Sequence, residues 1–314
     1  MDNILSIMSS EERAAFSLCA LYESAGYQKY RMSKFEEYAL YVQNKDFLVS
    51  ENVITFTDTD GKLLALKPDV TLSIIKNTRA QSGVMKVYYK ENVYRVSGST
   101  KSFKELMQAG LECLGEVTTE TVIEVLSLAK KSLDYISSEN VLEISHLDIV
   151  SGVLSACSVS EEGRREILMY LGEKNESGMR AVALREGLSA EAAAWICRLV
   201  TLYGAPEKVL PALDALALNP ALCAAIEELR AIVAGLRALG ISDKLIIDFS
   251  VVNDMNYYNG IAFKGFVNGV PAGVLSGGEY DSLLKKMKKN EKGIGFAVYM
   301  DELSRLADAK GAGK

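Results

Sequence analysis

Hydrophobic and polar residues alternate on both sides of an Asn268-Gly269 pair, between about residue 256 and residue 279. Alternation with a period of two indicates strands, and Asn-Gly between two such runs is typical of a type I′ hairpin turn. We therefore predict a hairpin across residues 253–281. One face of its first strand is expected to lie on the core and the other to carry a tyrosine beside very small residues. The core face is Tyr257, Ile261, Phe263 and Val267, and the other is Asn256, Tyr258, Gly260, Ala262 and Lys264.

The returning strand of this hairpin has the same combination of small and phenolic residues. Gly277-Gly278 come directly before Glu279, Tyr280 and Asp281. Two tyrosines beside glycines suggest a site for a small polar ligand. An ordinary hairpin with a glycine bulge has the same pattern, so the spacing alone leaves both interpretations open.

The N-terminal segment has the pattern of a capped helix. Serines at 9–10 precede glutamates at 11–12, which places a capping residue and negative charge at the positive end of a helix dipole. An apolar stripe follows and Gly26 ends it. Further on, Asp60-Gly61 marks a hairpin tip, and residues 84–96 alternate as a strand that ends near Arg95.

The middle of the chain, residues 151–243, is alanine-rich and is expected to be helical. Capping signals occur at Ser160 and Ser189, each followed by a glutamate in the first turn. Charges are not clustered there, which is typical of compact helix packing. Residues 245–252 then resume the sheet and lead into the hairpin.

Asp69 and Thr71 have two possible arrangements. They share a face if the chain stays extended after Pro68, whereas Asp69 caps a helix if one begins at Val70. The residues alone favour the cap.

Residues 103–115 also admit two structures. A period of two places Gln108, Gly110 and Glu112 on one face of a strand, and so predicts a polar floor with a gap. Helix propensity instead pairs Gln108 with Glu112 at i, i+4 on a solvated face. Local preference favours the helix.

Composition narrows the class of protein. The chain has 314 residues, 49% of them hydrophobic and 24% charged, which fits one large or two moderate globular domains. Its formal net charge of −6 argues against a broad nucleic-acid-binding surface. Apolar runs are too short for a membrane span and the N-terminus has no signal-peptide pattern, so the cytoplasm is the expected compartment.

Residues that often bind metals are scattered along the chain. The lone histidine, His146, is expected to be a hydrogen-bonded structural residue. The lysine-rich run at 285–292 is a separate feature, and we expect it to be a solvated loop. The cysteines lack a CxxC pair, so neither a disulfide framework nor a zinc site is indicated. We expect them to be buried free thiols; they are Cys19, Cys113, Cys157, Cys197 and Cys223.

Five blocks, in order, resemble the catalytic core of histidyl-tRNA synthetase and its paralogues in the class II aminoacyl-tRNA synthetase family. They are ALKPDVT at 65–71, VYR at 93–95 with QAGLECLG at 108–115, NYYNGIAF at 256–263, LSGGEYDSLL at 275–284 and GIGFAV at 293–298. The resemblance implies an α+β fold with an antiparallel sheet flanked by helices. It implies a core at 1–150 and 244–314 and a helical insertion at 151–243. Histidyl-tRNA synthetases continue into an anticodon-binding domain, which we do not expect here because the sequence stops shortly after the last block.

The resemblance also implies a pocket for a histidine-type ligand. Carboxylate, hydroxyl and amide groups would hold the α-ammonium, and tyrosine hydroxyls with a glutamate would complete the imidazole end. The corresponding residues are Asp69, Thr71, Gln108, Glu112, Tyr258 and Tyr280.

The phosphate side departs from the pattern of an active synthetase. Arg95 matches the arginine that contacts the α-phosphate, but Asn253 and Glu302 stand where the family has further arginines. A carboxylate in place of a cation turns attraction into repulsion, and two unit charges about 4 Å apart at an effective dielectric near 20 interact with about 4 kcal/mol. That corresponds to about three decades in binding.

A retained amino-acid pocket with lost phosphate-binding cations resembles the regulatory subunits of ATP phosphoribosyltransferase. The resemblance implies a non-catalytic subunit without a cofactor or metal, which activates a short-form catalytic subunit and mediates histidine feedback in histidine biosynthesis. It implies a homodimer within a hetero-octamer, histidine as effector, and neither nucleic acid nor membrane as partner. The alternative is an amino-acid adenylating enzyme or truncated class II synthetase.

Overall fold

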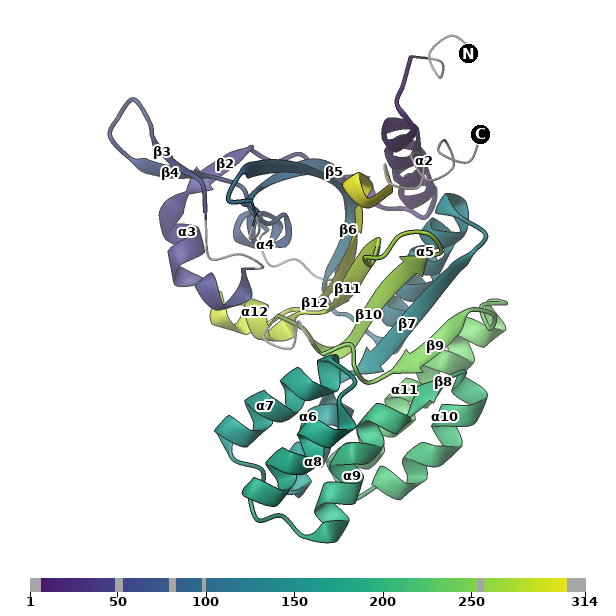
Figure 1. Ribbon diagram of the computed structural model, residues 1–314. Coiled ribbons are helices and arrows are strands. Elements are labelled where there is room, and N and C mark those ends of the chain that lie inside the picture. Colours follow the sequence, from purple (N-terminus) through teal and green to yellow (C-terminus); the bar gives the residue numbers. More distant parts are fainter. Residues whose placement is uncertain (1–6, 49–52, 79–82, 98–99, 253–256, 304–314) are drawn as a thin grey trace.

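A nine-stranded, mostly antiparallel sheet forms the centre of the protein (Figure 1). The structure is a computed structural model that describes residues 7–48, 53–78, 83–97, 100–252 and 257–303. Only the β1–β5 and β7–β9 pairs of this sheet are parallel. In spatial order its strands are β1 (Gln28–Lys29), β5 (Val84–Val96), β6 (Phe103–Gly115), β12 (Lys292–Tyr299), β11 (Leu275–Glu279), β10 (Asn259–Val267), β7 (Asn140–His146), β9 (Leu245–Asp248) and β8 (Tyr203–Gly204).

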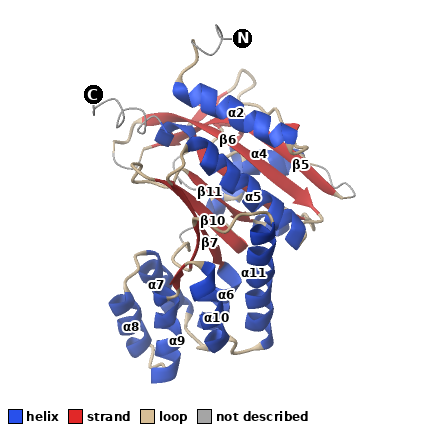
Figure 2. Cartoon of the chain, turned by 90° about the vertical axis from the view of Figure 1, so that its right-hand side faces the viewer, coloured by secondary structure: helices blue, strands red, loops and turns tan. Residues whose placement is uncertain are grey.

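Helices α2 (Ser10–Ser24) and α5 (Thr119–Ile136) pack side by side on one face of the sheet (Figure 2). The predicted N-terminal cap of α2 is confirmed: Ser9 Oγ accepts the Glu12 N–H at 3.2 Å, and the Glu12 carboxylate accepts the Ser9 N–H at 3.0 Å. This reciprocal pair satisfies two of the backbone donors that a helix start leaves open. The end of the helix at Gly26 (φ +90°) is also confirmed.

The opposite face carries a smaller unit with its own buried cluster. Strands β2 (Phe35–Glu37), β4 (Leu63–Leu66) and β3 (Thr55–Thr57) form a three-stranded sheet in that order. Helices α3 (Tyr38–Gln43), α4 (Thr71–Asn77) and α12 (Asp281–Lys286) and the short 3₁₀ turn η1 (Lys45–Phe47) lie beside it (Figure 1). The predicted tip at Asp60-Gly61 is confirmed, with Gly61 at φ +80°.

Residues 147–238 are mainly helical and gather at one end of the molecule (Figure 1). Both predicted caps are confirmed, since Ser160 Oγ accepts the Gly163 N–H at 3.0 Å and Ser189 Oγ accepts the Ala192 N–H at 3.1 Å. The domain boundaries at 151 and 243 stay a prediction. The elements are α6 (Leu147–Ala156), α7 (Glu161–Gly172), α8 (Glu176–Arg185), α9 (Ala190–Thr201), α10 (Pro206–Ala212), η2 (Leu213–Leu216) and α11 (Pro220–Ala238).

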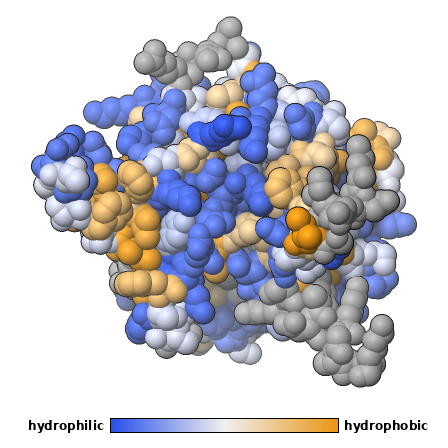
Figure 3. Space-filling view, turned by 90° about the horizontal axis from the view of Figure 1, so that it is seen from above, coloured by the Kyte–Doolittle hydropathy of each residue, from blue (hydrophilic) through white to orange (hydrophobic). Residues whose placement is uncertain are grey.

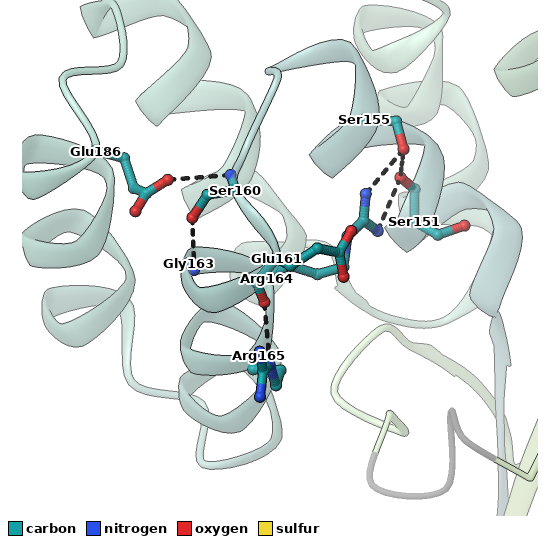
Figure 4. Close-up of polar contacts among 8 residues, drawn as sticks. All are labelled: Ser151, Ser155, Ser160, Glu161, Gly163, Arg164, Arg165 and Glu186. Atoms are coloured by element: carbon teal, nitrogen blue, oxygen red, sulfur yellow. Dashed lines mark hydrogen bonds and ion pairs between the residues drawn. The ribbon is translucent and has the colours of Figure 1, made fainter.

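Polar side chains join neighbouring helices of this region (Figure 4). Arg164 of α7 donates to Ser155 Oγ of α6 at 2.9 Å. Glu186, after α8, accepts the Ser160 N–H at 3.0 Å and so ties the start of α7 to the end of α8. These contacts fix helix ends that would otherwise rely on water.

Three expectations are wrong in detail. Residues 103–115 form strand β6, because pairing with β5 on one side and β12 on the other outweighs local helix propensity. The hairpin turn is not type I′: Gly269 has φ +87°, but Asn268 does not adopt a positive φ, and the loop runs on to Val274, whose N–H bonds to Gly265 O. Cys223 is exposed, whereas the other four cysteines are buried free thiols.

The surface seen from above mixes hydrophilic residues with hydrophobic patches (Figure 3). Phe35, Phe56 and Leu63 of the small sheet are among the exposed large hydrophobic residues, and the rings of Phe35 and Phe56 meet edge to face at 5.7 Å. In the described ranges we find no helix that is both long and apolar enough to span a bilayer.

Candidate functional site

A cavity of about 280 Å³ lies between the nine-stranded sheet and the segment that leads into α4. All seven residues of the predicted site line it, although they come from five separate stretches of the chain. The residues that the resemblance to synthetases implied for one site therefore lie close together in the fold. The lining residues are Phe47, Leu48, Asp69, Val70, Thr71, Tyr89, Arg95, Gln108, Glu112, Tyr257, Tyr258, Ser276, Tyr280, Gly295, Phe296, Ala297 and Tyr299.

Glu112 is the buried acid of this cavity, with 2% of its surface exposed. Thr71 Oγ1 donates to its Oε1 at 2.7 Å, and Tyr280 Oη donates to its Oε2 at 2.7 Å. Burial raises the pKa of Glu112 to about 8, with a smaller contribution in the same direction from Asp69, while the two hydroxyl donors oppose the shift. A cation or an N–H donor entering the cavity would favour the ionised form.

Asp69 supports the start of α4 and lines the cavity at the same time. Its Oδ1 accepts the Leu72 N–H at 2.8 Å, the hydrogen bond expected of a helix cap, although the helix begins at Thr71 with Val70 as its N-cap residue. Burial raises the pKa of Asp69, and the Leu72 N–H and the Arg95 charge oppose the shift. Thr71, the first residue of α4, therefore faces the cavity as a consequence of the cap.

Glycines on neighbouring strands make room for the polar side chains. Glu112 of β6 pairs with Gly295 of β12, and a methyl group at Gly295 would overlap the carboxylate. Tyr89 of β5 pairs with Gly110 of β6, where a Cβ would come within 2.6 Å of the phenol oxygen. The close approach of these side chains to backbone thus requires glycine at both positions.

The two predicted tyrosines lie over glycines in the same way. A Cβ at Gly278 of β11 would come within 2.8 Å of the Tyr258 ring, and one at Gly293 of β12 would overlap the Tyr280 ring. The small-residue floor expected from the sequence is present in part: Gly278, one of the two glycines named on the returning strand, lies under Tyr258, whereas Gly293 of β12 lies under Tyr280.

Arg95 marks the other end of the cavity. Its Nε donates to Pro68 O at 3.1 Å. Nearby, Tyr299 Oη and Ser276 Oγ share a hydrogen bond of 2.5 Å between β12 and β11, and buried Gln108 pairs with Tyr299 across β6 and β12. This end offers neutral hydrogen-bonding groups and one guanidinium.

The remaining predicted residues are not part of the described cavity lining. Asn253 is outside the described residues, and Glu302 lies just after β12 and is not among the lining side chains that the structure describes. His146 Nε2 lies 3.3 Å from Glu228 Oε2, which agrees with a hydrogen-bonded structural histidine. In the described part of the chain, no three His, Cys, Asp or Glu side chains are grouped to hold a metal ion.

Sequence reasoning missed several lining residues. Tyr89 shares a strand face with Arg95 at a spacing of six, so the period of two could have identified it. Tyr257 was assigned to the core, but it lines the cavity with its ring centroid 4.8 Å from that of Tyr258. It precedes the first residue of β10, where strand alternation no longer applies. Phe47 comes from a 3₁₀ turn, and no periodic signal marks it.

A mostly antiparallel sheet with helices on one face and an amino-acid-sized polar cavity on the other defines the class II aminoacyl-tRNA synthetase core. The sequence model of the histidyl-tRNA synthetase family matches residues 6–303. A relative from Thermoanaerobacter sp. (strain X514), named ATP phosphoribosyltransferase regulatory subunit, is 30% identical over 90% of this chain and 74% of its own length. The chain belongs to the histidyl-tRNA synthetase family, among its ATP phosphoribosyltransferase regulatory subunits.

Further relatives and solved structures agree. The Alkaliphilus metalliredigens protein of the same name is 28% identical over 89% of this chain and 72% of its own. An ATP phosphoribosyltransferase regulatory subunit/histidyl-tRNA synthetase from Bacillus halodurans shares the fold with a TM-score of 0.81 at 24% identity, over 94% of this chain and 79% of that one. An ATP phosphoribosyl transferase (HisG:HisZ) complex from Thermotoga maritima includes a chain that shares the fold with a TM-score of 0.73 at 18% identity. The match covers 93% of this chain and 98% of that one.

Proposed function

We propose that this chain is the regulatory subunit of an ATP phosphoribosyltransferase, which activates a short-form catalytic subunit and transmits feedback by histidine. The observation that carries the proposal is the similarity over most of the chain to relatives named ATP phosphoribosyltransferase regulatory subunit. The cavity supports it, because an effector requires a site and the polar lining suits a small amino acid.

Histidine is the ligand that the lining favours. Its α-ammonium and imidazole N–H are donors, and the cavity presents two carboxyl groups, from Asp69 and Glu112, together with neutral acceptors. Gln108 is positioned to accept from or donate to the amino-acid end. Feedback then requires that the two functional states of the complex bind histidine with different affinities.

The charge of the site supports a non-catalytic role. Joining an amino acid to ATP develops negative charge as pyrophosphate leaves, and cations must stabilise it. Among the cavity-lining residues that the structure describes, Arg95 alone carries a permanent positive charge. Synthetase chemistry is therefore the less favoured function.

A protein partner suits the surface better than a nucleic acid. Two arginines of the helical region form ion pairs within the chain: Arg180 with Glu176 at 2.7 Å and Arg185 with Glu166 at 2.5 Å. Exposed apolar residues such as Phe35 and Phe56 are typical of surfaces that join subunits. We propose a homodimer within a hetero-octamer that holds four copies of each subunit.

Reconstitution tests the proposal directly. The purified chain is mixed with a short-form catalytic subunit, and formation of phosphoribosyl-ATP is measured with and without histidine. We expect activity to require the chain and to be inhibited by histidine. Histidine-dependent exchange of pyrophosphate into ATP by the chain alone would support the adenylating enzyme instead.

A further inference from the structure

The ladder between β10 and β11 is interrupted next to the cavity. Residues Ala262 to Gly265 pair regularly with β11, but the next pair is Asn259 with Glu279. Gly260 and Ile261 are therefore extra residues on β10 that have no partner on β11, although Ile261 pairs with His146 of β7 on the other side. Such a bulge leaves backbone groups without a partner on the adjacent strand and changes the direction of side chains next to it.

A carboxylate fills this interruption. Glu279 Oε2 accepts the Ile261 N–H at 2.8 Å, and the Glu279 side chain is 6% exposed. Gly260 adopts a φ of +56°, and a methyl group there would overlap the same oxygen. The positive φ and the close approach both require glycine, so the bulge and the carboxylate are matched to one another.

Two cavity tyrosines flank this arrangement. Tyr258 comes directly before β10, and its ring lies over Gly278, the residue before Glu279. Tyr280, the residue after Glu279, donates to Glu112. Glu279 itself is absent from the described lining of the cavity, because neighbouring residues of a strand point to opposite faces.

We infer that Glu279 is a positioning residue of the cavity: by accepting the Ile261 N–H it holds the β10 bulge in the shape that directs Tyr258 over Gly278. The consequence for ligand binding rests on the function proposed above, whereas the consequence for the backbone does not.

The groups around Glu279 show which property of the side chain matters. Glu228 of α11 and Asp281 of α12 add negative charge, and His146 of β7 opposes them. Burial raises the pKa of Glu279 to about 7. A protonated carboxyl still has a carbonyl oxygen that accepts from Ile261, so the role depends on an acceptor at this position and not on charge.

Variants of the full chain separate these properties. Glu279→Gln keeps the length and an acceptor, Glu279→Leu keeps the approximate size without an acceptor, and Glu279→Asp keeps the carboxylate but shortens its reach. Glu143→Gln and Glu143→Leu serve as matched controls, because Glu143 is a partly buried glutamate on β7 outside the cavity lining. Amide hydrogen exchange at Ile261 and histidine affinity by calorimetry are measured for each.

We expect Glu279→Gln to match the wild-type chain within about twofold in both measurements. Glu279→Leu and Glu279→Asp should each speed exchange at Ile261 at least tenfold and weaken histidine binding about tenfold, consistent with loss of a buried hydrogen bond. The Glu143 variants should change neither. If the leucine variant does not fold, the aspartate variant decides.

Exchange at Ile261 as slow as in the wild-type chain for Glu279→Asp would overturn the positioning role. Faster exchange at Ile261 in Glu279→Gln would overturn it as well. If the wild-type chain does not bind histidine, the exchange measurement still decides the role of Glu279, and the proposed ligand alone is refuted.

Discussion

Replacement of Glu112 by glutamine should change how the stability of the chain depends on pH. The native pKa of Glu112 is raised from its ordinary value of 4.5 to about 8 by burial. Between these values the unfolded chain has an ionised Glu112 and the folded chain a protonated one, so folding takes up a proton. The contribution of Glu112 protonation to the free energy of unfolding is complete below pH 4.5 and is lost as the pH rises through 8.

The magnitude follows from the proton balance. Because the folded state binds one extra proton between pH 4.5 and pH 8, the free energy of unfolding falls by about 1.4 kcal/mol for each pH unit that the pH rises. Over the full window the loss amounts to at most about 5 kcal/mol. Glu112→Gln has no titrating group there, while the other shifted carboxyl groups, such as Glu279, remain in both proteins and cancel in the comparison.

Urea unfolding of both proteins at pH 5, 6, 7 and 8 measures the effect. We expect the wild-type free energy of unfolding to fall relative to that of Glu112→Gln by about 1.4 kcal/mol per pH unit up to pH 7, and to level off near pH 8. Parallel curves would refute the reasoning, because they would mean that Glu112 titrates as an exposed carboxyl group.

Three further substitutions, the first with a matched control, test other features. Gly295→Ala should abolish histidine binding, since its methyl group overlaps the Glu112 carboxylate, whereas Gly273→Ala, whose nearest neighbouring atom would be 3.6 Å away, should leave binding intact in the same calorimetric titration. Tyr280→Phe removes one donor to Glu112 and should weaken histidine binding about tenfold or more at pH 8; equal affinity would show that this hydroxyl is dispensable. Ser160→Ala should lower the free energy of unfolding by about 1 kcal/mol in urea titrations without changing histidine affinity, and a change in affinity would contradict the assignment of Ser160 as a helix cap only.

Local signals in the sequence were sufficient wherever neighbouring residues determine the structure. The Ser9 cap, the Gly61 turn and the Ser160 cap each depend on contacts within four residues. The strand at 103–115 could not be settled in this way, because its two partners, β5 and β12, come from different parts of the chain. Sheet pairing of this kind overrides local helix preference.

For the cavity, too, some residues could be identified from the sequence and others could not. The resemblance identified Glu112 and Tyr280 as neighbours in space, and the fold brings them to 2.7 Å although 168 positions separate them. It did not reveal that Gly293 lies under Tyr280 or that Gly278 lies under Tyr258, because contacts between neighbouring strands cannot be assigned until the register is known. Phe47 lines the cavity from a 3₁₀ turn, and no periodic sequence pattern predicts such a turn.

The most direct test of the proposed function is the histidine sensitivity of the reconstituted phosphoribosyltransferase complex. Complexes are assembled with the wild-type chain, with Glu112→Gln and with Glu143→Gln, and inhibition of phosphoribosyl-ATP formation is titrated with histidine. We expect all three to activate the catalytic subunit, and the histidine concentration for half inhibition to rise at least tenfold for Glu112→Gln alone. Unchanged inhibition in the Glu112→Gln complex would contradict the account, because histidine would then act at another site.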